Sequence, residues 1–309
     1  MKKTVWGIAG MGITVALTIG LIQFMGLLLD PFESADGLDA VKAFHSLEEN
    51  SLDVIVYGSS HAWKGCDTRV MRDKYGIAAY NYGCHWQRIN TTELFLKDSL
   101  RTQSPKVACI ETFTVNSVLH NTDLTGEIYY TKPMKNFKAK QEYLKQCFGT
   151  NIERYASYYF PIIMFHDNWN AVTEENFVNT DYERFVESSG FYPTSDIYPC
   201  KLPDYHTFTQ KDIRESALKT LDEIVAVCNE HDIRIIFFTC PWEGENKFGN
   251  ALTEYAKKNN CEYLDLFRYY EEMGLDGNSD LNDAGHLNTS GAGKVADFLG
   301  KYIVEHYRL

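Results

Sequence analysis

The chain has 309 residues and a formal net charge of −12. An acidic chain with no basic stripe has nothing to neutralise phosphates, so we exclude nucleic acid as a partner. Eight cysteines in this length are too few for a disulfide-stapled scaffold, and no Cys or His spacing suggests a metal site. Cys147 and Cys200 are a candidate pair, although sequence does not set connectivity. The length suits one large α/β domain with an elaboration.

The amino terminus predicts a membrane anchor. Lys2 and Lys3 precede an uncharged run over residues 4–29, which at 1.5 Å per residue is long enough to cross a hydrocarbon core of about 30 Å. A cleaved signal peptide has a shorter apolar region and an Ala-x-Ala-like site, neither of which precedes Asp30. We therefore expect a single-pass protein of the cell membrane, with residues 1–29 as transmembrane anchor and the basic end in the cytoplasm. The rest, which begins with a linker over residues 30–51, is then extracytoplasmic.

Beyond the linker, apolar runs alternate with segments of helical periodicity. The run over residues 53–57 is typical of a parallel strand covered on both faces. The further strands are expected at residues 78–82, 106–110, 233–239 and 262–267, and the helices at 68–75, 91–102, 212–230, 250–258 and around Val295 to Ile303. This alternation predicts an α/β domain over residues 52–309 with a flavodoxin-like, doubly wound parallel sheet of about five strands. Ligands of such sheets bind at the carboxyl ends of the strands.

Residues 113–209 break the alternation and are expected to form a mostly helical insert. The segment is rich in Tyr, Phe, Asn and Asp. Two interpretations stay open: the aromatic side chains line a carbohydrate site over the active-site edge, or they are the core of a subdomain. Trp169 in this insert and Trp242, which follows the strand over residues 233–239, are the candidate substrate-binding residues. Trp242 is the better candidate for a pocket wall.

Two motifs near opposite ends of the chain predict a nucleophilic triad. Gly58-Ser-Ser-His follows the first strand, and Asp283-Ala-Gly-His precedes the last helix. A nucleophilic serine needs a base to take its proton, and the base needs a carboxylate to hold its tautomer. Either motif alone is commonly a turn or a helix-entry loop. Together and in this order they predict Ser60 as nucleophile, His286 as base and Asp283 as its partner.

Two nearby histidines are left out of this catalytic set. His61 and His85 lie beside the serine motif and in a loop, where a histidine more often packs or forms a structural hydrogen bond.

These blocks resemble the SGNH (GDSL-like) hydrolases, in the membrane-anchored branch that acts on cell-surface polymers. Ser60 matches the nucleophile position of that family, and Ser59 stands where it has aspartate. The block Asp283 to His286 matches the last family motif closely. Asn81-Tyr-Gly83 resembles the second motif, whose glycine amide binds the oxyanion. The third motif, Gly-x-Asn, is matched only by Asn116, without the glycine.

The resemblance implies acyl transfer through a covalent ester on Ser60, with Ser60, Gly83 and Asn116 as the oxyanion hole and with no metal or organic cofactor. It also implies an O-acyltransferase or esterase acting on a cell-envelope or secreted polysaccharide. The partners would then be an acyl donor, a carbohydrate acceptor and a multi-spanning membrane acyltransferase. The alternative is a non-catalytic accessory subunit that binds a glycan or such a membrane partner.

Overall fold

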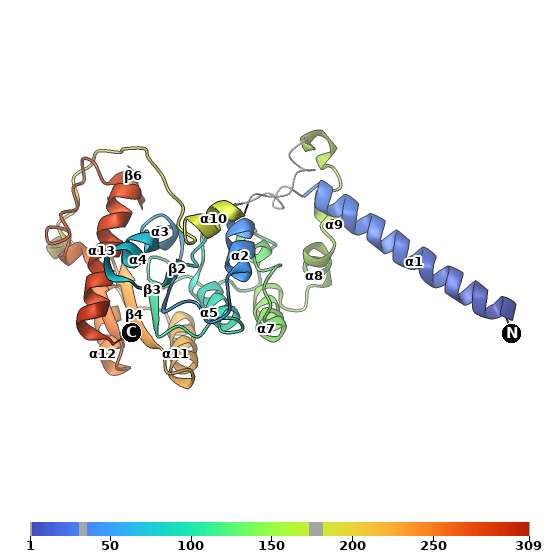
Figure 1. Ribbon diagram of the computed structural model, residues 1–309, viewed down its shortest axis with the longest axis horizontal. Helices are drawn as coiled ribbons and strands as arrows, with labels where there is room; N and C mark the ends of the chain where they lie inside the picture. The colour runs from blue at the N-terminus through green and yellow to red at the C-terminus, as the bar shows by residue number, and fades with distance from the viewer. Residues whose placement is uncertain (1, 31–35, 173–181, 309) are drawn as a thin grey trace.

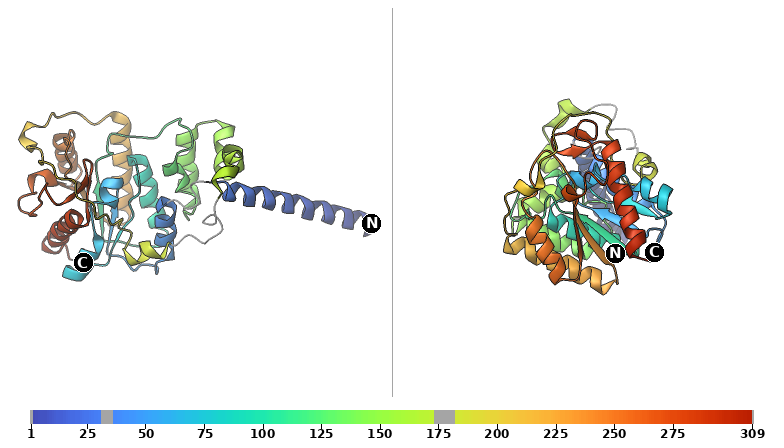
Figure 2. Two further views of the ribbon diagram at one scale, coloured as in Figure 1. Left: turned by 90° about the horizontal axis from the view of Figure 1, so that it is seen from above. Right: turned by 90° about the vertical axis from the view of Figure 1, so that its left-hand side faces the viewer.

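The computed structural model describes residues 2–30, 36–172 and 182–308. Helix α1 (Lys2–Leu28) projects from one end of an elongated body, and the α/β domain forms the other end (Figures 1 and 2). Residues Ile8–Leu28 make α1 the one described helix that is long and apolar enough to cross a membrane, a property that signal sequences share.

The domain is built on a parallel sheet. Its strands are β1 (Val54–Tyr57), β2 (Ala79–Asn81), β3 (Val107–Glu111), β4 (Arg234–Thr239) and β5 (Glu262–Asp265). They pair in the order β2-β1-β3-β4-β5, with every neighbour parallel. This is the order of flavodoxin-like sheets, whose ligands bind where the winding reverses between β1 and β3. The predicted α/β class and five-strand parallel sheet are confirmed.

Helices cover both faces of the sheet. Ile55 and Tyr57 of β1 pack into one cluster, with side chains of α5 (Ile89–Ser99), α11 (Glu215–Glu230) and α12 (Gly249–Lys258). Val54 and Val56 pack into a second cluster on the opposite face, with α4 (Thr68–Tyr75) and α13 (Thr289–His306). Burial on both faces explains why the strands read as continuous apolar runs.

Residues 36–46 of the expected linker instead form helix α2 (Asp36–Ser46). Its Leu38, Val41 and Phe44 are buried in the domain core, and the Phe44 ring stacks on that of Tyr82 with centroids 3.9 Å apart. The helical spacing of these apolar residues explains the difference, because it gives α2 a face to bury.

The regular elements of segment 113–209, where it is described, are helices, but loops make up more than half of it, so the insert is less helical than expected. Its elements are α6 (Gly126–Tyr129), α7 (Phe137–Phe148), α8 (Ile152–Tyr159), α9 (Ile162–Phe165), the 3-10 helix η1 (Asn168–Ala171), α10 (Glu183–Glu187) and η3 (Tyr205–Thr207). Tyr129, Phe148 and Tyr158 are fully buried, so these aromatic side chains are core. Residues 173–181 lie outside the described part. Cys147 and Cys200 are not paired, and both are free thiols.

Two short elements were not expected from the sequence. Helix α3 (Ser60–Trp63) begins just after β1, and a hairpin of β6 (Leu281–Asp283) and β7 (His286–Leu287) precedes α13. The 3-10 helix η4 (Leu266–Arg268) follows β5. Both α3 and the hairpin lie toward the end of the molecule that is remote from α1 (Figure 1).

Candidate active site

Ser60 lies at the carboxyl edge of the sheet, on the turn from β1 into α3. Gly58 has φ +143°, and a Cβ there would lie 2.7 Å from Glu111 Cβ, so the turn requires glycine. Ser59 is the N-cap of α3 and its Oγ accepts a hydrogen bond from His61 N–H at 3.3 Å. The hydroxyl of Ser60 is therefore held between the ends of β1 and β3, where the winding of the sheet reverses.

The β6–β7 hairpin brings Asp283 and His286 together. They are directly paired across the antiparallel ladder, with Ala284 and Gly285 as the two-residue turn. Gly285 N–H donates to Asp283 Oδ1 at 2.8 Å, and Asn282 Nδ2 donates to Asp283 Oδ2 at 2.9 Å. Residues paired across a two-residue hairpin turn lie on the same face of the two strands. This explains why Asp283 and His286 are three positions apart in the sequence.

The three residues predicted as a triad meet in a chain of hydrogen bonds. His286 Nε2 lies 2.7 Å from Ser60 Oγ, across 226 positions of sequence. His286 Nδ1 lies 2.8 Å and 3.0 Å from the two carboxylate oxygens of Asp283. With the proton on Nδ1 donated to Asp283, Nε2 is free to accept the proton of Ser60.

The electrostatics of the pair favour an ionised aspartate. Partial burial pushes the pKa of Asp283 upward, but hydrogen bonds from Gly285 N–H and from His286 outweigh it and hold the pKa below its ordinary value. A carboxylate that stays charged at neutral pH fixes the tautomer of His286 and stabilises its protonated form.

Two of the predicted oxyanion donors, Gly83 and Asn116, make hydrogen bonds to other residues. Gly83 N–H donates to Asn81 Oδ1 at 3.1 Å, and the Asn81 side chain is in turn anchored to Ala62 O and Cys66 O. Asn116 Oδ1 accepts from Arg214 N–H at 2.8 Å, which directs that side chain to the start of α11. This bond uses the side-chain oxygen of Asn116 and leaves its Nδ2, the expected oxyanion donor, uncommitted.

The amide of Ser60 itself is the third candidate donor. It opens α3, where backbone N–H groups have no helical partner. Among the residues described, no acceptor is found for it.

Glu111 is a site residue that the sequence analysis missed. Its carboxylate is buried under the serine turn, where it accepts hydrogen bonds from Phe113 N–H at 2.9 Å and from Ser59 Oγ at 3.4 Å. Burial raises the pKa of Glu111 to about 8, although these hydrogen bonds act to lower it. The sequence could have indicated Glu111, because it is an acidic residue at the end of an apolar strand whose carboxyl end lies at the site.

His61 belongs to an aromatic cluster beside the triad. Its ring stacks on Phe113 with centroids 3.6 Å apart, and it meets the edge of Trp242 at 5.2 Å and the ring of His286 at 5.1 Å. Burial, and secondly the proximity of His286, lower the pKa of His61 well below its ordinary value. His61 is therefore neutral at pH 7 and packs as an apolar wall. The pKa of His85 is likewise lowered, first by desolvation.

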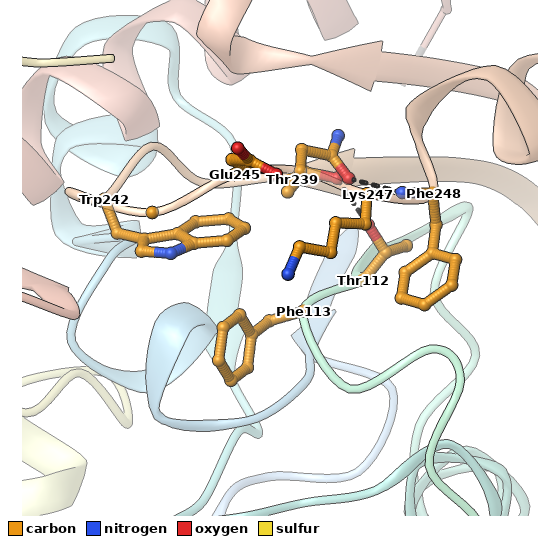
Figure 3. A pocket seen from close by; sticks show the side chains of 9 residues that line it. Thr112, Phe113, Thr239, Trp242, Glu245, Lys247 and Phe248 are labelled. Carbon is orange, nitrogen blue, oxygen red and sulfur yellow. Dashed lines mark hydrogen bonds between the residues drawn. The ribbon is translucent and has the colours of Figure 1, made fainter. Parts of the chain in front are cut away.

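A cavity of about 490 Å³ adjoins this cluster. Phe113 and Trp242 form its wall on the side of His61, and Lys247 extends toward these two rings (Figure 3). The floor carries the hydroxyls of Thr112 and Thr239, which are 2.6 Å apart. Trp242 is thus at the site as expected.

Trp169 is not at the site. It lies in η1, where the neighbouring Asn168 donates to Leu29 O at 3.2 Å, beside the end of α1. The segment 113–209 runs from the site edge to the anchor and then returns to the domain, where Tyr192 N–H donates to Trp63 O of α3 at 3.0 Å.

No family model and no curated protein matches this chain. Among solved structures, a candidate acylhydrolase from Bacteroides fragilis NCTC 9343 is similar to it, with a TM-score of 0.42 and 12% sequence identity over 87% of this chain and 95% of that one. A likeness this weak carries no argument about activity, so the proposed function rests on the geometry of the site.

Proposed function

We propose that this protein is a serine-dependent acyl-transfer enzyme of SGNH type, an O-acyltransferase or esterase, that acts on a cell-envelope or secreted polysaccharide. The observation that carries the proposal is the continuous path from Ser60 Oγ through the imidazole of His286 to the carboxylate of Asp283, at 2.7 and 2.8 Å. These are the separations at which a base can take the proton of a nucleophile and be oriented by a third group.

The reaction proceeds in two balanced halves. Ser60 Oγ attacks the acyl carbon of an ester while its proton passes to His286 Nε2, and Asp283 stabilises the imidazolium. His286 then protonates the leaving alkoxide, which departs as an alcohol and leaves an acyl ester on Ser60. In the second half His286 deprotonates a sugar hydroxyl or water, which attacks that ester and regenerates the serine. The Ser60 amide is the oxyanion donor supported best, since the Gly83 amide is engaged by Asn81.

The cavity beside His61 suits a carbohydrate acceptor. Phe113 and Trp242 offer apolar ring surface, and the exposed Glu245 and Lys247 offer hydrogen bonds. Phe113 and Trp242 separate this cavity from His61, whose ring centroid lies 5.1 Å from that of the catalytic His286. A sugar hydroxyl at high effective concentration competes with water for the acyl group. A partner then supplies the acyl donor, and the class of partner that we propose is a multi-spanning membrane acyltransferase.

The proposal predicts a reactive serine. A fluorophosphonate probe should label Ser60 in the purified full-length protein, because His286 can take the proton of its hydroxyl as the serine attacks phosphorus. The labelled peptide is identified by mass spectrometry. His286→Ala should abolish labelling, whereas Ser59→Ala should retain it. Labelling that survives in Ser60→Ala would mean that the reactive group is elsewhere.

A non-catalytic accessory subunit is the second candidate, and one observation favours it. One of the three expected oxyanion donors is engaged elsewhere, because the Gly83 amide donates to Asn81 Oδ1. A triad without a formed oxyanion hole loses a large part of its rate. Absence of labelling at Ser60 in a folded protein would favour this role, in which the chain binds a glycan or a membrane acyltransferase.

For location, the proposal is a single-pass protein of the cell membrane with its catalytic domain outside the cytoplasm. Lys2 and Lys3 flank the apolar helix on its amino-terminal side, and basic flanks stay in the cytoplasm. Protease added to intact cells should then digest the domain and leave a short membrane-bound fragment that keeps Lys2 and Lys3, measured by mass spectrometry. A mature protein that begins near residue 30 would instead indicate a cleaved signal sequence.

A further inference from the structure

An exposed apolar surface lies beside the end of α1. It is formed by residues 159–169, which we call the α9 segment. Its exposed large side chains are Tyr159 (41%), Phe160 (37%), Ile163 (43%), Met164 (46%) and Trp169 (56%). From Phe160 to Phe165 no residue carries a charge. Such side chains gathered on one short segment are unusual for a surface that meets only water.

The α9 segment is fastened to α1. Gln23 Nε2 donates to Tyr159 O at 2.8 Å, and Asn168 Nδ2 donates to Leu29 O at 3.2 Å. The backbones meet closely at Gly26, where a Cβ would lie only 2.9 Å from Ile162 N. Both ends of the segment are therefore tied to the last turns of the apolar helix (Figures 1 and 2).

This attachment sets the depth of the segment. The apolar span of α1, Ile8–Leu28, has 21 residues, which at 1.5 Å each about match a hydrocarbon core of about 30 Å, so the whole span is needed to cross it. Gln23 lies five residues before the end of this span, at a depth of about 7 Å. Interfacial elements bury their apolar faces about 5 to 10 Å into the boundary of headgroups and acyl chains.

We infer that the α9 segment is a second membrane contact, which inserts its apolar side chains into the headgroup region of the bilayer that α1 crosses. The chemistry fits that region, since Tyr and Trp prefer membrane–water interfaces and Ile163 and Met164 gain from leaving water. This inference rests on the proposed membrane anchor, but not on the proposed catalysis.

The contact has a consequence for the site. A lone helix lets a domain swing about its attachment, whereas two contacts restrict its orientation. Helix α3 and the β6–β7 hairpin lie toward the end away from α1 and the α9 segment (Figure 1). A membrane contact at residues 159–169 therefore holds the triad away from the lipid surface, on the side where an envelope polymer lies.

Three exposed tryptophans allow a direct test. Trp6 (76% exposed) lies in α1, Trp169 (56%) in the α9 segment, and Trp86 (52%) in the loop after β2, where its ring faces the Arg88 guanidinium at 5.8 Å. The full-length protein is reconstituted in phosphatidylcholine vesicles with and without brominated acyl chains. Trp6→Phe, Trp86→Phe and Trp169→Phe are compared with the wild type, so that the emission lost in each variant is that of one residue. Circular dichroism checks that each variant is folded.

We expect the emission of Trp169 to be lost in brominated vesicles to the same degree as that of Trp6, and the emission of Trp86 to be unchanged. Quenching of Trp6 without quenching of Trp169 would overturn the interfacial contact and leave the anchor standing. That result would indicate that water or another protein covers the segment. Quenching of neither would refute the anchor itself, and the interfacial contact with it.

Discussion

Replacing Ser60 with alanine should lower ester turnover by about three orders of magnitude or more, the loss that removal of a triad member causes. The change removes the hydroxyl that His286 Nε2 meets at 2.7 Å and leaves the base with nothing to activate. The rate is measured on a small acyl ester with full-length protein in detergent. KM should change little, because the Ser60 side chain contributes to the chemical step rather than to binding.

Ser59→Ala is the matched control, since it removes a hydroxyl one position earlier. The Ser59 hydroxyl contacts Glu111 at 3.4 Å and caps α3 instead of meeting the histidine. Its loss should cost about 1 kcal/mol of stability as a helix cap and far less activity than Ser60→Ala. Equal losses of turnover in the two variants would contradict the assignment of the nucleophile.

The same pair of variants separates transfer from hydrolysis in cells. If a sugar hydroxyl is the acceptor, Ser60→Ala lowers the acyl content of the surface polymer, whereas loss of an esterase raises it. We expect a fall, because a membrane-tethered site meets polymer hydroxyls at high effective concentration. The acyl content is measured by release of the acyl group with alkali.

The wild type should lose several kcal/mol of its free energy of unfolding between pH 5 and pH 9. Glu111→Gln should remove most of this loss. The pKa of Glu111 is raised from 4.5 to about 8 by burial, so between these values the folded chain binds a proton that the unfolded chain has released. Stability therefore falls by about 1.4 kcal/mol for each step of one in pH between the two pKa values, and it changes no further above pH 8. Glutamine resembles the protonated acid in shape but does not titrate.

The measurement is the free energy of unfolding by urea at pH 5 and pH 9, for wild type and variant. Glu245→Gln is the control, because that carboxylate is exposed at the rim of the cavity and its replacement should leave the pH dependence unchanged. A pH dependence in Glu111→Gln equal to that of the wild type would mean that Glu111 is ionised in the folded protein throughout this range.

The sequence predicted the sheet well because each strand is a short apolar run that both faces bury. The strand expected over residues 53–57 is found at Val54–Tyr57, and the helix expected over 68–75 is found at Thr68–Tyr75. The linker over residues 30–51 was predicted wrongly for its middle part. Residues 36–46 carry apolar side chains at helical spacing, and the stacking of Phe44 on Tyr82 shows that α2 belongs to the core.

The sequence by itself determined the strand pattern, the apolar amino-terminal helix and the residues from which a triad is proposed. Local periodicity and short motifs encode these features, because each depends on neighbours a few positions apart. Tertiary structure alone decided that Glu111 lies buried under Ser59, that Asn116 points to α11, and that residues 159–169 lie against α1. These contacts join segments that are distant in sequence, and their energies depend on burial and direction, which no local pattern records.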